Sequence, residues 1–187
     1  MKEKEYKLII PKKKFFYKLL NIINISNNYN IHNDCIKTYD DFFYDTKNFD
    51  FLKSKFYFRK RIDYHKKEIE LTIKELKKSI DNIHIRDVYT TVIPTFEYKY
   101  IPFNLKKFIC SITKDTNFFE YNLLFKIKQK RIFKHIKYDK IKNPIALLSL
   151  DIITINKNDI LNIFLEVELE SIICDNKELE SIFYGLL

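Results

Sequence analysis

Residues 164–170 read Phe-Leu-Glu-Val-Glu-Leu-Glu, and this stretch decides the fold class. Side chains alternate across a β-strand, so Glu166, Glu168 and Glu170 are expected on one face and the leucine and valine side chains on the other. Three carboxylates in a row on one strand face repel each other unless positive charge lies opposite them. The stretch therefore predicts a strand with an apolar face against a core and an acidic face turned towards cations.

The same alternation recurs along most of the chain. The predicted strands cover residues 3–9, 38–45, 56–62, 68–75, 84–93, 124–135, 145–155 and 162–173. Helices are expected after Pro11, over residues 103–112 and from residue 176, and the polar segment 26–33 is predicted to be a loop. Strands outnumber helices and no regular β-α-β order appears, which favours an α+β, mainly β fold with an antiparallel sheet.

Basic side chains follow the same rule on other strands. Arg59 and Arg61 share one face of the strand 56–62, and Lys74 shares a face with Glu70 in the strand 68–75. For each strand alone, the charged face can simply be exposed to water. Taken together, rows of like charge are favourable when acidic strands lie across from basic strands, as they do in a closed barrel with polar faces inward and helices outside.

Composition restricts the class of protein. The chain has 187 residues, 46% hydrophobic and 32% charged, which suits a single folded domain over residues 1–187. Its net charge of +9 favours an anionic partner. Three separated cysteines without a CxxC spacing indicate neither a zinc site nor a disulfide framework. No apolar run is long enough to span a membrane, so a cytoplasmic location is expected, and no feature sets the oligomeric state.

Seven motifs in order resemble the CYTH superfamily, whose members are also called triphosphate tunnel metalloenzymes. They are Glu3-x-Glu5-x-Lys7, Phe43-Tyr44-Asp45-Thr46, Arg59-Lys60-Arg61, Glu70-Leu71-Thr72-Ile73-Lys74, Lys130-Arg131, Leu150-Asp151 and Glu166-Val167-Glu168. They extend over nearly the whole chain. The resemblance implies an eight-stranded antiparallel tunnel, closed as a barrel with helices packed outside. Compared with this family, the final helix is expected to be short or truncated.

The resemblance also implies a chemistry, the hydrolysis of a triphosphate with Mg²⁺ or Mn²⁺. These ions prefer oxygen ligands, and arginine forks match phosphate oxygens. The implied metal ligands are Glu3, Glu5, Asp151, Glu166, Glu168 and Glu170. The implied triphosphate-binding residues are Lys7, Arg59, Arg61, Lys74, Arg86 and Arg131. Glu5, Lys7 and Arg59 are the expected catalytic residues.

Two positions depart from the family pattern. The fifth strand, with Arg86 followed by Asp87-Val88-Tyr89-Thr90, lacks most of the family's acidic residues, and position 129 is Gln where a lysine is usual. If Arg131 points inward, Lys128 and Lys130 belong to the opposite face. Aromatic residues near the motifs are expected in the core rather than stacked on a ligand ring; they are Phe43, Tyr44, Phe56 and Phe58.

Several functions are compatible with these motifs. The favoured substrate is inorganic triphosphate or a small organic triphosphate such as thiamine triphosphate. The alternatives are an RNA 5′-triphosphatase acting on an RNA 5′ end, a protein similar to class IV adenylate cyclases, and a non-catalytic binder of polyphosphate or nucleotides.

Overall fold

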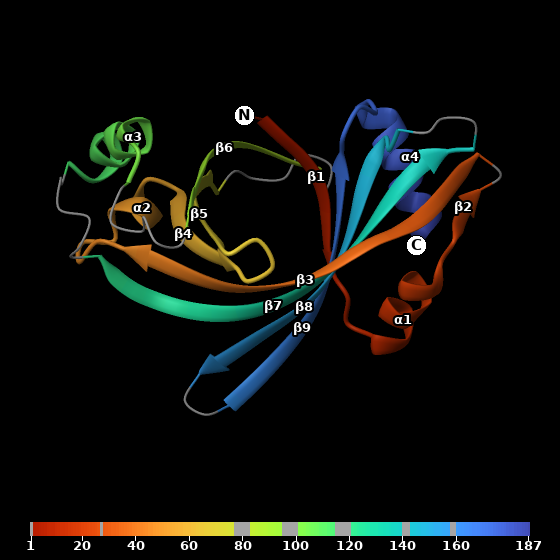
Figure 1. The fold of residues 1–187 in the computed structure, drawn as a ribbon, viewed down its shortest axis with the longest axis horizontal. Coiled ribbons are helices and arrows are strands. Elements are labelled where there is room, and N and C mark those ends of the chain that lie inside the picture. Colours follow the sequence, from red (N-terminus) through yellow and green to blue (C-terminus); the bar gives the residue numbers. More distant parts are fainter. Residues whose placement is uncertain are drawn as a thin grey trace.

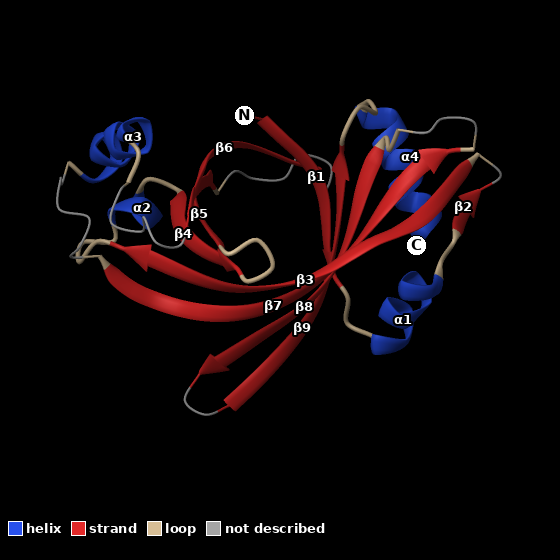
Figure 2. Cartoon of the chain, viewed as in Figure 1, coloured by secondary structure: helices blue, strands red, loops and turns tan. Residues whose placement is uncertain are grey.

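Strands form most of the molecule. The computed structural model describes residues 2–26, 28–76, 83–94, 101–114, 121–139, 143–157 and 160–187. Figure 2 shows how strands dominate over helices. The elements in chain order are β1 (Lys2–Ile9), α1 (Lys13–Asn21), β2 (Asn24–Ser26), β3 (Tyr29–Asp45), α2 (Asp50–Lys53), β4 (Phe56–Asp63), β5 (Glu68–Glu75), β6 (Ile83–Pro94), α3 (Phe103–Thr113), β7 (Asn122–Tyr138), β8 (Ala146–Lys157), β9 (Ile160–Ser171) and α4 (Asn176–Leu186).

All the strand pairings are antiparallel, as the alternation predicts. The strands follow the order β2-β3-β4-β5-β6-β1-β9-β8-β7, and β7 pairs in addition with β3. This last pairing runs from Tyr29 opposite Tyr138 to Asp45 opposite Asn122, with two register shifts. β3 and β7 therefore lie side by side across the whole molecule (Figure 1). The prediction of a mainly β, antiparallel fold with a few helices is confirmed.

One segment differs from its prediction. The expected loop over residues 26–33 is wrong from Tyr29 onward, because β3 begins there and pairs with the end of β7. His32 lies opposite His135 in that register. The polar composition of this segment favours a turn, but the neighbouring strand supplies its backbone hydrogen bonds and outweighs the local preference.

A single helical turn, α2, was also not predicted. It follows Phe49, whose φ of 57° places it in the left-handed region. The Asp45 carboxylate accepts hydrogen bonds from the backbone N–H groups of Thr46, Phe51 and Leu52 at 2.8, 3.0 and 3.1 Å. The Asp-Thr pair of the Phe43–Thr46 motif therefore fixes the chain where it leaves β3 and enters α2.

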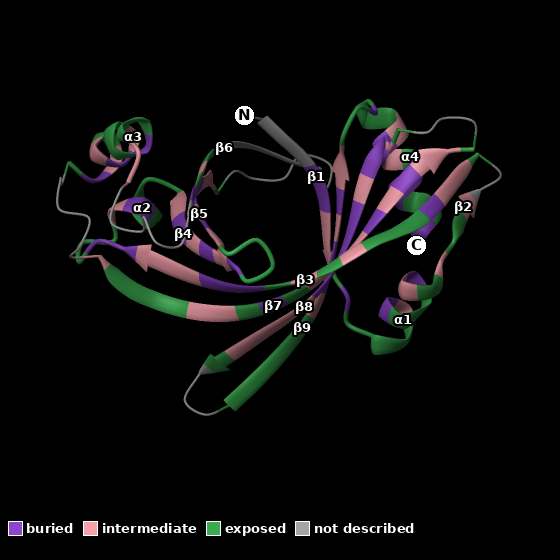
Figure 3. Ribbon diagram, viewed as in Figure 1, coloured by how far each residue is buried: buried purple, intermediate pink, exposed green. Residues whose placement is uncertain are grey.

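The apolar strand faces are covered by helices in two places. Helices α1 and α4 pack on β1, β8 and β9, where buried residues include Tyr6, Leu148 and Leu169. Helices α2 and α3 pack on β4 and β5 around Phe51 and Ile109. Figure 1 shows the two helix pairs at opposite ends of the molecule, and Figure 3 shows the buried strand segments beside α4. Among the described residues, none of the helices has the length and apolar character needed to cross a membrane.

Candidate functional site

A cavity of about 340 Å³ lies against the polar faces of the strands. The sequence predicts that acidic and basic strand faces lie across from each other. Two acidic residues, Glu5 and Glu168, and two basic residues, Arg59 and Lys74, all line this one cavity. They come from β1, β9, β4 and β5. Nine of the predicted metal-binding, triphosphate-binding and catalytic residues line it: Glu5, Lys7, Arg59, Arg61, Lys74, Arg131, Glu166, Glu168 and Glu170. The alternation of each strand directs these side chains inward and the apolar ones to the cores.

Lys7 joins two glutamates on one side of the cavity. In the pairing of β1 with β9, Lys7 lies opposite Glu168. Its Nζ is 2.8 Å from Glu168 Oε1 and 2.7 Å from Glu166 Oε1. Burial acts to lower the pKa of Lys7, but the charges of Glu168 and Glu166 outweigh it and raise that pKa. The lysine is therefore a fixed cation.

Arg131 makes the second link on this side. Its Nε and Nη2 donate to the Asp151 carboxylate at 2.8 and 2.6 Å, and Nη2 also donates to Glu168 Oε2 at 2.5 Å. Burial acts to raise the pKa of Glu168, but Arg131 and Lys7 outweigh it and hold that pKa well below its usual range. Glu168 is therefore ionised and held from two directions.

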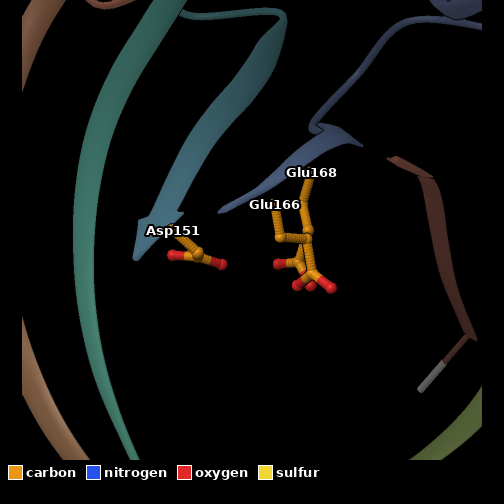
Figure 4. A group of neighbouring side chains, drawn as sticks. All are labelled: Asp151, Glu166 and Glu168. Carbon is orange, nitrogen blue, oxygen red and sulfur yellow. The ribbon is translucent and has the colours of Figure 1, made fainter. Parts of the chain in front are cut away.

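Three carboxylates form a group that can hold a metal ion. Oxygen atoms of Asp151, Glu166 and Glu168 lie within 4.8 Å of one another. Figure 4 shows the three side chains extending from β8 and β9 towards a common point. Burial, with a smaller contribution from the charge of Glu168, outweighs the opposing effect of Lys7 and raises the pKa of Glu166 to about 7. An oxygen-only donor set with excess negative charge fits Mg²⁺ or Mn²⁺.

The other predicted metal ligands have different positions. Glu5 is buried and lines the cavity, and it lies opposite Glu170 in the pairing of β1 with β9. Neither belongs to the group of oxygen atoms around Asp151. Glu3 lies opposite Arg86 in the backbone register of β1 and β6, and the side chains of both lie outside the described residues.

Two arginines from β4 occupy the other side of the cavity. Arg61 donates from Nε and Nη2 to the two oxygens of Asp41, each at 2.7 Å, and from Nη2 to Gln129 Oε1 at 2.6 Å. Arg59 Nη2 donates to Glu70 Oε1 at 2.5 Å, and its Nη1 lies 3.6 Å from Asp41 Oδ2. Burial acts to raise the pKa of Glu70, but Arg59 and Arg61 outweigh it and lower that pKa.

Asp41 was missed by the sequence reasoning. It is 1% exposed and contacts both arginines. The signal was present, since Asp41 has the same strand parity as Phe43 in the motif and two neighbouring arginines on one face require a counter-charge. Gln129 was noted only as a departure from a lysine, yet it accepts a hydrogen bond that a lysine cannot accept.

The structure defines which side chains face the cavity in β7 and β6, the two strands that depart from the family pattern. Gln129 and Arg131 line the cavity, while Lys128 and Lys130 are exposed on the other face of β7. In β6, Val88 and Thr90 line the cavity at the positions where the family pattern has acidic residues, so the acids noted as absent from the sequence are absent from the described part of this wall. The acidic side of the cavity is therefore supplied by β1 and β9, with the buried Asp151 of β8 beside them, while Asp41 and Glu70 lie on the basic side.

The aromatic residues divide between core and cavity. Tyr44, Phe56 and Phe58 pack in or against the core beneath α2 and α3, as expected. The core expectation is wrong for Phe43, which lines the cavity together with Tyr57. The centroids of these two rings are 5.6 Å apart. The reason is parity: Phe43 lies directly opposite Arg59 and therefore shares its inward face.

Comparison with known proteins assigns the family. The model of the CYTH domain matches residues 1–184. The chain belongs to the CYTH family. No curated protein matches this CYTH chain.

Solved structures show the same CYTH fold at low sequence identity. One is described as the putative adenylyl cyclase HpAC1 from Hippeastrum with a dominant triphosphatase activity. It has a TM-score of 0.73 and 16% identity, over 99% of this chain and 86% of that chain. A putative adenylate cyclase from Bacillus halodurans has a TM-score of 0.65 and 14% identity, over 98% of this chain and 86% of that chain. A conserved hypothetical protein from Pyrococcus furiosus has a TM-score of 0.55 and 20% identity, over 98% of this chain and 90% of that chain.

Proposed function

We propose that this CYTH protein is a cytoplasmic, metal-dependent triphosphatase whose eight long strands enclose a tunnel. The observation that carries the proposal is one cavity in which Glu166 and Glu168 of β9, with the buried Asp151 of β8 beside them, meet the cations of β1, β4, β5 and β7. The pairing of β7 with both β8 and β3 supports an enclosed site. Enclosure matters because charges interact more strongly where water is excluded.

The charge balance supports a metal ion. Among the described residues that line the cavity, carboxylates outnumber lysines and arginines, and the buried Asp151 adds a further acid beside them. A divalent cation on Asp151, Glu166 and Glu168 would neutralise this excess before a polyanion enters. When bound, such an ion polarises a phosphoryl oxygen as a Lewis acid.

The basic side fits the triphosphate. Arg59 Nε is buried and has no hydrogen-bond partner among the described residues. A buried, unpaired guanidinium donor is costly, and a phosphate oxygen is a fitting acceptor for it. Arg61 and Arg131 present further N–H groups, while Lys7 and Lys74 contribute compact charges. Arg86 belongs to this proposed set from its motif alone.

The reaction is the attack of water on the terminal phosphorus. The bond from that phosphorus to the bridging oxygen breaks, and its electron pair leaves with the diphosphate. Lys7 and Arg59 stabilise the charge that develops on the transferred group and the leaving group. Glu5, buried at the cavity wall, accepts the proton of the attacking water.

A panel of metals and substrates tests the proposal. Phosphate release is measured from tripolyphosphate, thiamine triphosphate, ATP and triphosphate-ended RNA, with Mg²⁺, with Mn²⁺ and with chelator. We expect metal-dependent release from tripolyphosphate or a small organic triphosphate, and a loss of at least about 100-fold in Glu5→Gln and Glu168→Gln. Glu180→Gln in α4 is the matched control and should retain activity.

Other outcomes identify the alternatives. Faster release from RNA than from tripolyphosphate would indicate an RNA 5′-triphosphatase, and cyclic AMP from ATP would indicate a cyclase. Tight tripolyphosphate binding with no release from any substrate would indicate a non-catalytic binder and would reject the hydrolase.

A further inference from the structure

A row of lysines lies on the outer face of β7. Lys126, Lys128 and Lys130 alternate with Ile127, Gln129 and Arg131, which line the cavity on the inner face. Lys128 and Lys130 are exposed, and the Lys126 side chain is 40% exposed. This part of β7 lies in the long β3–β7 ribbon that runs between the two helix pairs in Figure 1.

Neighbouring strands add a fourth lysine and an aromatic ring. Phe42 of β3 lies opposite Lys126 on one side and opposite Lys60 of β4 on the other. The Nζ atoms of these lysines lie 4.8 and 5.4 Å from the centre of the Phe42 ring. We call the surface made by Lys60, Lys126, Lys128 and Lys130 the lysine face.

Little negative charge among the described residues offsets the three lysines of β7. Asp40 Oδ2 lies 2.7 Å from Lys126 Nζ. Among the described side chains, no carboxylate comes within 4.0 Å of the ammonium groups of Lys128 and Lys130. Like charges on one strand face repel each other, and one carboxylate offsets three lysines only in part, so an anion along the row would be favourable.

An exposed tyrosine is held beside these lysines. Tyr64 follows β4 and is 56% exposed. Its hydroxyl donates to Asp40 Oδ2 at 2.9 Å, the same oxygen that contacts Lys126. The ring is therefore tied to the edge of the lysine face, although most of its surface is open to a ligand. A fixed, exposed aromatic ring beside a row of cations suits a nucleobase with its phosphates alongside.

We propose that the lysine face binds single-stranded nucleic acid, with phosphates along Lys126, Lys128 and Lys130 and a base stacked on Tyr64. Alternate residues of a strand are about 6.7 Å apart, so successive lysines can meet successive phosphates of an extended chain. A duplex is excluded from this stacking because its bases are already paired and stacked. The surface lies outside the cavity and is independent of hydrolysis.

The test measures binding of a labelled single-stranded RNA by fluorescence anisotropy. The RNA has about 12 nucleotides, within the range that single-strand-binding domains cover, and a 5′-hydroxyl end. Excess tripolyphosphate is present, so that cavity binding does not contribute. We expect the Lys128→Glu/Lys130→Glu variant to bind at least about tenfold more weakly and its salt dependence to fall by about 1.4 in slope, as two lost phosphate contacts require.

Matched variants separate the lysine face from net charge alone. Lys53→Glu/Lys107→Glu makes the same charge change on exposed positions of α2 and α3 and should change binding less than about twofold. Tyr64→Ala should weaken binding at least about fivefold, whereas Tyr64→Phe keeps the ring and should retain most of it. Circular dichroism confirms that each variant is folded.

Several results would overturn the proposal. Equal loss in the two lysine variants would show a non-specific attraction. Displacement of the RNA by tripolyphosphate would place the RNA in the cavity. Absence of RNA binding, or binding to anionic phosphatidylserine vesicles in its place, would show that the lysine face has another partner or none.

Discussion

Replacing Asp41 by asparagine should lower the free energy of unfolding, by an amount that can be estimated from the contacts of Asp41. Asp41 is 1% exposed and accepts both donors of the Arg61 fork at 2.7 Å. An asparagine keeps the shape, but its amide N–H₂ faces an arginine N–H donor and its charge is lost. Removing one partner of a buried ion pair costs about 3–5 kcal/mol. Gln129 and Glu70 remain beside the arginines, so we expect about 3 kcal/mol.

The assay is urea and thermal denaturation of Asp41→Asn and a matched neighbour. For a chain of this size, about 3 kcal/mol corresponds to a melting temperature lower by about 6–12 °C. Asp40→Asn is the control, since Asp40 lies on the opposite strand face and its partner Lys126 is 40% exposed. We expect that control to lose about 1 kcal/mol or less. Tripolyphosphate should stabilise Asp41→Asn more than the parent protein, because it supplies the missing negative oxygens.

Two results would refute this reasoning. An Asp41→Asn loss no larger than that of Asp40→Asn would show that the carboxylate does not neutralise the buried arginines. A smaller stabilisation of the variant by tripolyphosphate would show that the phosphates do not reach Arg61.

Three further predictions follow from the site and the core. Burial raises the pKa of Glu166 to about 7, so protons compete with a metal ion for this carboxylate below that pH. Calorimetry should therefore show the affinity for Mn²⁺ falling by up to about tenfold per pH unit below pH 7. The Glu166→Gln variant should not show this pH dependence. Gln129→Lys places a cation where Arg61 needs an acceptor, so the urea midpoint should fall and binding of tripolyphosphate, measured by calorimetry, should be salt-sensitive. Leu169→Ala empties a fully buried position beneath α4 and should lower the free energy of unfolding by about 2–5 kcal/mol in urea titrations, whereas Leu187→Ala, at an exposed position, should change it little.

Strand faces could be predicted from the sequence because they depend on local alternation. Glu166 and Glu168 enter the cavity while Val167 and Leu169 enter the core, as their spacing requires. The β4–β5 hairpin has its expected extent for the same reason. The structure shows that these glutamates share one cavity, while their proposed roles stay predictions.

Long-range pairing could not be predicted in the same way. Residues 29–33 have loop-like composition, and their pairing with β7, together with β2 at Tyr29 and Asn30, makes them a strand. Asp41 likewise shows its role only when β4 brings two arginines to it. A pattern within one strand gives the face of a residue, whereas the partner across the sheet depends on the whole fold.

The ion pairs inside the cavity have a consequence for which anions can enter. Lys7, Arg59, Arg61 and Arg131 each already contact a carboxylate, so an anion that binds them competes with internal partners at every contact except Arg59 Nε, which is unpaired within the described part of the chain. A small anion such as chloride or sulfate can replace one contact and leaves a carboxylate stranded. A ligand with several phosphates replaces many contacts together. If the proposed function is correct, this network should favour anions with several phosphates over simple anions such as chloride and sulfate.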